Sequence, residues 1–187
     1  MQNSIFAQKL PFAASAMPNE IFTDEFYQPY HAAVEIALRM LCQARRILCA
    51  DMEEETVRQI TFRLKTPNSI SDKLRKKNLP VTCEAASAAL NDVAGLRVVL
   101  TSVEAVYRYA ALLTASPLAE YVLSRDYIAN PKKSGYQSLH LLMMVPVVWR
   151  GQHRMTPIEI QLRTSAMDAW AVMEHDAFYK PASANLS

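Results

Sequence analysis

The chain has 187 residues and a mass of 21.1 kDa, which is typical of a single domain. Hydrophobic residues make up 51% and charged residues 20%, so a wholly disordered chain is excluded, and no apolar run is long enough to span a membrane. Lys and Arg number 20 against 18 Asp and Glu, and this net charge of +2 excludes a general polyanion binder. Three cysteines without a C-x-x-C pair favour reduced thiols in a cytoplasmic protein.

The first half of the chain predicts an arm, two helices and one strand. Residues 1–25 lack clean periodicity, so we expect a loose N-terminal arm. Apolar residues at helical spacing predict an amphipathic helix over 29–48, and alternation predicts a strand over 57–65. Ser69 and Asp72 resemble a capping box, which predicts a short helix after them.

The second half alternates between strand and helix patterns. Helices are predicted at 84–91, 102–116 and 165–179, and strands at 96–101, 119–128, 138–149 and 156–164. Strands mixed with helices indicate an α/β or α+β domain, a mixed β-sheet flanked by helices. We expect one domain over residues 26–180 and a short C-terminal tail over 181–187.

Positive charge gathers in one segment of this nearly neutral chain. Between Arg63 and Lys77, six basic residues are opposed only by Asp72. Lys73 and Lys76 lie three residues apart, so they share one side of the predicted helix. Such a cluster could cradle a polyphosphate, and the alternative is an ordinary solvated helix face.

Polar residues alternate along two of the predicted strands, with Glu159, Gln161 and Arg163 on one and Tyr136, Ser138 and His140 on the other. Alternate residues of a strand share a face, so these side chains would line a common cleft if the two strands share a sheet. The alternative is a solvent-exposed sheet face, with His140 as a structural histidine.

Two carboxylates come from separate elements of the predicted fold. Asp92 follows a short helix, and Glu159 lies on a strand. Mg²⁺ needs only one or two carboxylates when phosphate oxygens complete its shell, so this pair could bind a magnesium ion. The alternative is that Asp92 contacts a helix end or Arg97.

Gly135 is one of only three glycines in the chain, and it precedes Tyr136 directly. A scarce glycine indicates a position where a side chain does not fit. An exposed tyrosine at the start of a strand could stack on a nucleobase, and the alternative is a half-buried sheet residue. Gly151 lies between two apolar runs and predicts a hairpin turn.

Taken in order, these residues resemble the synthetase domain of the RelA/SpoT family, the enzymes that make the alarmones ppGpp and pppGpp. The match covers about residues 26–180 and runs through five blocks: RLKTPNSISDKLRKK, DVAGLR, RDYIANPKKSGYQSLH, IEIQLRT and MDAWAVMEH. Five ordered blocks are far more specific than one motif. The small size and the FYQPYHAAVE segment are similar to the single-domain small alarmone synthetases, most of all the RelQ type.

The resemblance implies a nucleotidyltransferase-like fold and a GTP/GDP diphosphokinase. Such an enzyme transfers the β,γ-diphosphate of ATP to the ribose 3′-hydroxyl of GDP or GTP and releases AMP. Reactions of this type need positioning and charge neutralisation more than a covalent nucleophile. The implied cofactor is Mg²⁺, and the implied context is the stringent response in the cytoplasm.

Roles for individual residues follow from the matched positions. Arg63 and Arg97 would hold adenine between them, and the ATP phosphates would be held by Lys65, Ser69, Lys73, Arg75 and Lys76. Asp92 would bind Mg²⁺, and Glu159 would help to bind it or take the 3′-hydroxyl proton. Tyr136 would stack on guanine, and the rest of the acceptor would be contacted by Lys132, Ser138, His140 and Gln161.

Some positions depart from the family pattern. Phe62 stands where the family usually has glycine, which puts the adenine pocket in doubt. The helix residues that bind pppGpp or single-stranded RNA in RelQ-type enzymes are only partly matched, by Arg39, Arg45 and Arg46. Related proteins form homotetramers through further C-terminal helices, whereas this chain ends at Ser187.

Other functions remain alternatives at this point. A polymerase-β-like nucleotidyltransferase would need G-S followed by D-x-D, and neither occurs. The same fold with another acceptor stays open: a tRNA 3′ end, GMP or an adenine nucleotide. A non-catalytic nucleotide- or RNA-binding regulator is opposed by the presence of both carboxylates. The His175-Asp176 pair lacks further metal ligands, so we expect synthesis without hydrolysis.

Overall fold

The computed structural model describes residues 17–179, with side chains as far as Glu174. Its strands are β1 (Val57–Leu64), β2 (Ala94–Leu100), β3 (Glu120–Asp126), β4 (Leu139–Trp149) and β5 (Gln152–Thr164). Its helices are α1 (Pro18–Ile21), α2 (Asp24–Met52), α3 (Pro67–Lys76), α4 (Cys83–Ala89), α5 (Val103–Thr114) and α6 (Ser165–Tyr179). The predicted tail over 181–187 and the side chains of His175 and Asp176 lie outside the described residues.

The strands form one mixed sheet in the order β1-β2-β5-β4-β3. β2 and β5 are parallel neighbours, and the other three pairs are antiparallel. The predicted mixed sheet flanked by helices is therefore confirmed, and each predicted strand and helix occurs near its expected position. Gly151 lies in the β4–β5 hairpin turn with a φ of 74°, a backbone conformation that glycine adopts without strain.

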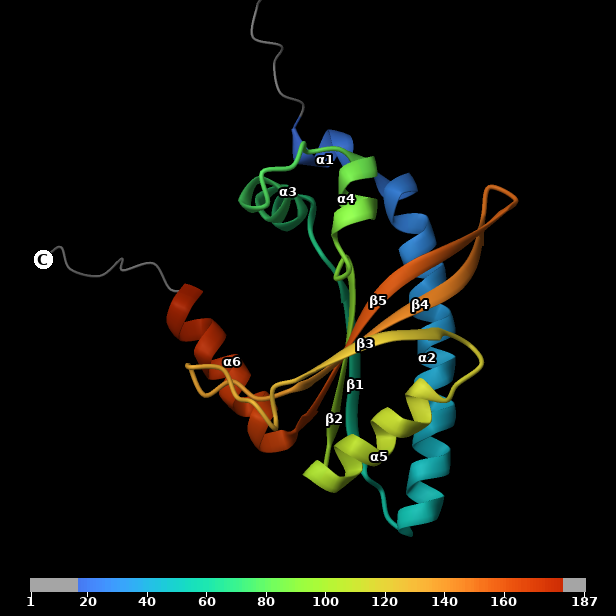
Figure 1. Ribbon diagram of the computed structural model, residues 1–187, viewed down its shortest axis with the longest axis vertical. Helices are drawn as coiled ribbons and strands as arrows, with labels where there is room; N and C mark the ends of the chain where they lie inside the picture. The colour runs from blue at the N-terminus through green and yellow to red at the C-terminus, as the bar shows by residue number, and fades with distance from the viewer. Residues whose placement is uncertain (1–16, 180–187) are drawn as a thin grey trace, which may run out of the picture.

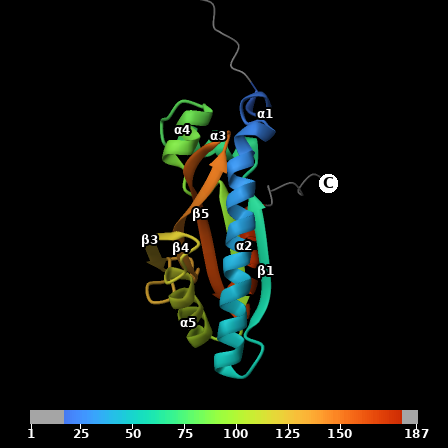
Figure 2. The same ribbon diagram turned by 90° about the vertical axis from the view of Figure 1, so that its right-hand side faces the viewer.

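One face of the sheet is covered by α2 and α5, which lie on the same side in both ribbon views (Figures 1 and 2). Leu41 and Leu48 of α2 are at most 1% exposed, and Ile160 of β5 and Leu96 of β2 are buried beneath them. The hydroxyl of Tyr109 on α5 donates to the Leu41 carbonyl at 2.7 Å and ties the two helices together. Over residues 17–179, no helix combines the length and the apolar character needed to cross a membrane.

The folded chain begins before residue 26, which corrects the expected extent of the arm. Residues 18–21 form α1, and α2 already starts at Asp24. Between them, Phe22 is only 3% exposed, and its ring packs edge-on against Phe26 at 5.0 Å between centroids. Burial of these two rings holds the segment on the domain. Residues 1–16, the rest of the predicted arm, lie outside the described chain.

The cap of α3 differs from the predicted capping box. The helix begins at Pro67, and Thr66 is its N-cap, with a side-chain oxygen that accepts from the Ser69 backbone N–H at 3.3 Å. Ser69 is therefore the third residue of the helix. Proline at the first helical position loses no hydrogen bond, so the Thr66-Pro67 pair starts the helix where the strand ends.

Candidate active site

The second face of the sheet carries polar side chains in two adjacent rows. Arg63 on β1 lies opposite Gly95 on β2, which lies opposite Glu159 on β5. In the next row, Arg97 on β2 lies opposite Gln161 on β5, and His140 on β4 lies opposite the same glutamine. The sequence left open whether β4 and β5 share a sheet. The structure pairs them directly, with their polar faces on the same side.

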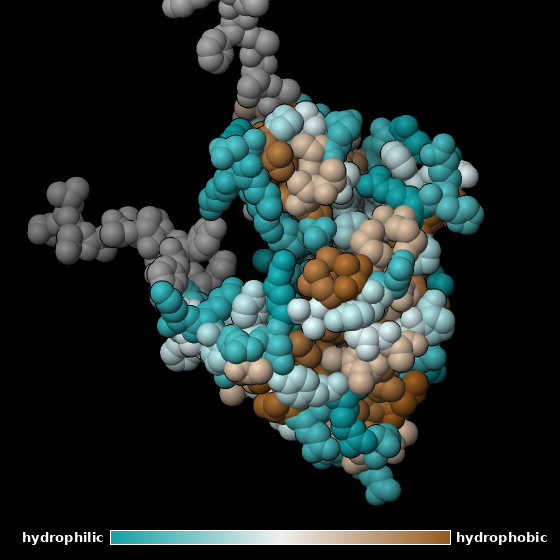
Figure 3. Space-filling model, in the orientation of Figure 1, coloured by the Kyte–Doolittle hydropathy of each residue, from teal (hydrophilic) through white to brown (hydrophobic). Residues whose placement is uncertain are grey.

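Two adjoining hollows lie over these rows. The first, of about 250 Å³, is lined among others by Asp92, Gly95 and Glu159. The second, of about 490 Å³, is lined by Lys132, Tyr136 and His140 and also by residues of α6. Both share Arg63, Arg97 and Gln161. Figure 3 shows the molecule hollowed between α3 and α6, with hydrophilic side chains at the opening.

Gly95 forms part of the floor of the first hollow. A Cβ added there would meet no protein atom within 4 Å, so the protein itself does not require glycine. The space that a side chain would occupy at residue 95 is part of the first hollow. Gly135 is different, because its φ is 85° and a Cβ would lie 3.3 Å from the Trp170 ring.

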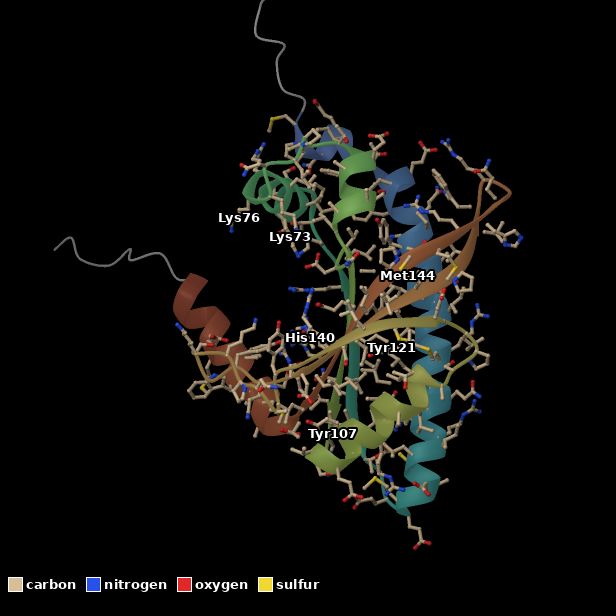
Figure 4. The ribbon with its side chains drawn as sticks, viewed as in Figure 1. Lys73, Lys76, Tyr107, Tyr121, His140 and Met144 are labelled. Atoms are coloured by element: carbon tan, nitrogen blue, oxygen red, sulfur yellow. The ribbon has the colours of Figure 1, made fainter. Side chains whose placement is uncertain are left out.

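Asp92 is paired with lysines rather than with Arg97. Its Oδ2 lies 2.5 Å from Lys73 Nζ and 3.2 Å from Lys65 Nζ. Its Oδ1 is buried and has no hydrogen-bond partner among the described residues. Figure 4 shows Lys73 and Lys76 on the side of α3 that faces the opening. One carboxylate oxygen is thus anchored and the other is left without a partner at the edge of the hollow.

Glu159 is held on both carboxylate oxygens. Nδ1 of His140 lies 3.2 Å from its Oε1, and Nε2 of Gln161 donates to its Oε2 at 2.9 Å. Burial raises the pKa of Glu159, but the hydrogen bond and charge of His140 outweigh it. Together with Gln161 and the charge of Lys73, they lower the pKa to about 2, so the side chain is an anion at neutral pH.

Tyr136 is buried, with 9% exposed, so of the two alternatives left open by the sequence the exposed ring is excluded. Lys132 Nζ lies 4.6 Å from the ring centroid, and the hydroxyl lies 2.8 Å from Nε2 of His140. Nη2 of Arg163 donates to the same hydroxyl at 2.7 Å. The ring nevertheless lines the second hollow, so its burial comes from polar neighbours rather than from the core.

Six of the predicted site residues line neither hollow: Lys65 and Lys73, which contact Asp92, and also Ser69, Arg75, Lys76 and Ser138. Ser138 is fully buried, and its hydroxyl donates to the Leu162 carbonyl at 3.2 Å. Ser69 is hydrogen-bonded to Thr66. Arg75 is exposed and forms an ion pair with Asp72. Lys76 faces the opening (Figure 4), and the other predicted residues line a hollow.

Three further residues at this site were given no role from the sequence, although Arg163 was expected to share the polar strand face of Glu159 and Gln161. Arg163 is 4% exposed, and its Nη1 donates to Asp168 of α6 at 3.0 Å. Asp168 also lies 3.3 Å from Nη1 of Arg97, and Glu174 of α6 lines the second hollow. Arg163 continues the Glu159–Gln161 alternation, which was a usable signal. The α6 residues had none, because helix packing brings them to the cleft.

Comparison with known proteins places the chain in a family. Residues 62–184 match the model described as "Region found in RelA / SpoT proteins". The chain is 33% identical to the GTP pyrophosphokinase YjbM of Bacillus subtilis over 84% of this chain and 73% of that protein. It is 36% identical to the GTP pyrophosphokinase YwaC of the same species over 63% of this chain, and the match spans 56% of YwaC.

Solved structures are similar over most of the fold. The small alarmone synthetase 1 from Bacillus subtilis bound to its product pppGpp matches with a TM-score of 0.76 and 33% identity, over 87% of this chain and 82% of that one. The same protein bound to AMPCPP matches with a TM-score of 0.70 and 30% identity, over 88% and 81%. The chain therefore belongs to the RelA/SpoT family, and its fold is that of the small alarmone synthetases.

Proposed function

We propose that this chain is a (p)ppGpp synthetase that transfers the β,γ-diphosphate of ATP to the 3′-hydroxyl of GDP or GTP and releases AMP. The observation that carries the proposal is that Asp92 and Glu159, from distant parts of the sequence, line one hollow together with two arginines. Its relatives are GTP pyrophosphokinases, and a similar enzyme has been solved with pppGpp as its product. No nucleophilic side chain is needed for this transfer.

ATP would bind over the first hollow. Arg63 and Arg97 are diagonal neighbours on one face of β1 and β2, so an adenine ring would stack between their guanidinium planes. Burial lowers the pKa of Arg97 and the charge of Arg163 lowers it further, whereas the charge of Asp168 raises it. The phosphates would extend toward α3, where Lys73 lies beside Asp92.

The donor set fits a hard divalent cation such as Mg²⁺. Among the described residues, no three His, Cys, Asp or Glu side chains cluster as a metal site, so the protein alone offers no cage. Asp92 Oδ1, buried and without a partner, is the kind of oxygen that Mg²⁺ takes when phosphates supply other ligands. Asp92 would hold the ion with help from Glu159. When bound, Mg²⁺ neutralises charge on the transferred diphosphate.

The acceptor nucleotide would occupy the second hollow. Guanine would stack at the Tyr136 ring, beside Lys132 and His140. Glu174 adds a carboxylate that could accept from N1–H and the C2 amino group of guanine, two donors that adenine lacks. With a pKa of about 2, Glu159 is suited to orient the 3′-hydroxyl as a hydrogen-bond acceptor and is a weak proton acceptor.

The remaining expectations belong to the same proposal. We propose a cytoplasmic enzyme that works without hydrolase activity in the stringent response. Self-association into an oligomer and binding of single-stranded RNA would use surfaces outside the two hollows, and Arg39, Arg45 and Arg46 of α2 are exposed or partly exposed basic candidates.

Identification of the product tests the function directly. The protein is incubated with Mg²⁺, γ-labelled ATP and, separately, GDP, GTP, GMP, ADP or tRNA, and labelled products are separated and identified. We expect label at the 3′ position of GDP and GTP. Label only on tRNA or ADP would mean that this molecule, rather than GDP or GTP, is the acceptor. No transfer to any acceptor would favour the non-catalytic regulator.

Asp92→Asn keeps the size of the side chain and removes its charge. We expect transfer to fall at least about 100-fold, because the lost charge weakens the contact of one oxygen with the lysines and of the other with the ion. Asp72→Asn is the matched control, since Asp72 is exposed on α3 and pairs only with Arg75 among the described residues. Equal turnover by Asp92→Asn and wild type would remove Asp92 from this role.

A further inference from the structure

Five side chains form a closed ring of hydrogen bonds, four of them lining the second hollow and the fifth, Glu159, lining the first. Nη2 of Arg163 donates to the Tyr136 hydroxyl at 2.7 Å and to Oε1 of Gln161 at 2.9 Å. The Tyr136 hydroxyl meets Nε2 of His140 at 2.8 Å, and Nδ1 of His140 meets Oε1 of Glu159 at 3.2 Å. Gln161 then donates to Oε2 of Glu159 at 2.9 Å. Both oxygens of one carboxylate thus lead back to one nitrogen of Arg163.

Elementary chemistry fixes the direction of four of the five bonds in this ring. A guanidinium only donates, so the oxygens of Tyr136 and Gln161 accept from Arg163. A carboxylate only accepts, so Nδ1 of His140 and Nε2 of Gln161 donate to Glu159. The fifth bond joins the Tyr136 hydroxyl to Nε2 of His140: the hydroxyl donates to a neutral imidazole, whereas an imidazolium donates to the hydroxyl. In the neutral ring the arrangement therefore selects the His140 tautomer that is protonated at Nδ1.

Arg163 itself is anchored more firmly than the residues it holds. It is 4% exposed, and its second nitrogen donates to Asp168 of α6 at 3.0 Å. A guanidinium presents its donors in one rigid plane, so Tyr136, Gln161 and Asp168 are held in fixed relation. A lysine at this position would offer one point charge and could not reproduce that geometry.

We propose that Arg163 is a positioning residue that links the acceptor-base site at Tyr136 to the orientation of the Glu159 carboxylate. The effect on catalysis that we infer from this link rests on the proposed function. The Tyr136 ring faces the hollow that takes the base, and its hydroxyl orients His140, which in turn holds Glu159. The position of a base stacked on the Tyr136 ring and the orientation of the Glu159 carboxylate are then coupled through the same hydrogen bonds. Residues that orient direct contacts in this way typically contribute about 10–100-fold to activity.

Tyr136→Phe removes one hydroxyl from the ring of hydrogen bonds and keeps the aromatic face. We expect kcat to fall about 10–100-fold with little change in the KM for GDP, because the base site survives while Glu159 loses its support. Tyr121→Phe is the matched control, since that tyrosine is exposed on β3 and its hydroxyl meets only Ser124. An unchanged kcat, or a raised KM for GDP at unchanged kcat, would overturn the proposal.

A double-mutant cycle tests whether Arg163 acts through Tyr136. Arg163→Lys removes the bond to Tyr136 and also the bond to Gln161, so it should lower kcat by at least the same factor. Adding Tyr136→Phe should lower kcat little further, because the path through Tyr136 is already cut. Full additivity of the two losses would contradict the link. Should Arg163→Lys fail to fold, the Tyr136→Phe result decides alone.

The histidine tautomer gives a readout that needs no turnover. ¹⁵N NMR of the wild-type protein should show His140 protonated at Nδ1 and unprotonated at Nε2, and the opposite tautomer would overturn the proposal. If wild type forms no 3′-diphosphate product but shows this tautomer, the proposed function fails while the hydrogen-bonded ring stands. If product forms and the tautomer is reversed, only this inference fails.

Discussion

Two carboxylates of the site are treated differently by their neighbours. Asp92 has one oxygen bound by two lysines and one buried oxygen without a described partner. Glu159 has both oxygens held by hydrogen bonds, from His140 and Gln161, with Lys73 contributing charge from a distance. The arrangement at Asp92 leaves one oxygen available to a cation, whereas the hydrogen bonds at Glu159 fix the orientation of its carboxylate. This difference supports separate roles for the two residues in the proposed transfer.

The low pKa of Glu159 predicts a specific acid sensitivity. Its ordinary value is 4.5 and its folded value is about 2, so the stabilisation is complete above pH 4.5 and is lost as the pH falls toward 2. Glu159→Gln lacks this contribution. We expect the difference in unfolding free energy between wild type and variant to shrink by about 2 kcal/mol from pH 6 to pH 3, measured by urea unfolding.

Glu120→Gln is the control for that measurement, because Glu120 is an exposed carboxylate on β3. It should follow the wild-type curve across the same range. Parallel curves for wild type and Glu159→Gln would contradict the lowered pKa.

At the scale of elements, side-chain caps set where three of the helices begin. Thr66, Thr82 and Ser102 each cap a helix, α3, α4 and α5, through a side-chain oxygen that accepts from the third residue of the helix. Only α3 carries a residue that contacts Asp92. The direction in which α3 leaves β1 therefore decides where Lys73 lies.

Thr66→Ala removes the N-cap of α3. We expect a loss of about 1 kcal/mol in stability by urea unfolding, together with a raised KM for ATP, since the first turn frays and Lys73 shifts. Thr82→Ala removes the equivalent bond on α4 and should cost about as much stability without raising the KM. A raised KM in both variants would show that lost stability alone explains the effect.

The whole molecule separates its core from its site by means of one sheet. α2 and α5 cover one face and bury it, whereas α3 and α6 flank the other face and leave the hollows between them (Figures 1 and 3). Side chains alternate across the strands, so β5 contributes Ile160 and Leu162 to the core and Glu159 and Gln161 to the site. Stability and chemistry are thus assigned to opposite faces.

Leu41→Ala tests this separation. Leu41 is fully buried on α2 beneath the sheet, so we expect a loss of about 2–5 kcal/mol in unfolding free energy and unchanged KM values for both nucleotides below the unfolding temperature. Ile47→Ala on the same helix is the control, because Ile47 is 46% exposed and should cost less than about 0.5 kcal/mol. Altered KM values in Leu41→Ala would mean that the two faces are coupled.

The amino-acid sequence by itself determined the elements, the mixed sheet and the polar face of β5, because apolar periodicity, turn residues and alternation are local properties of the chain. It also pointed to Asp92, Glu159 and the basic segment by residue type and order. Only the tertiary structure decided that β4 and β5 are neighbours, that Tyr136 is buried and that Asp168 belongs to the site. These facts depend on strand order and helix packing, which arise from contacts between residues far apart in the chain and leave no local pattern.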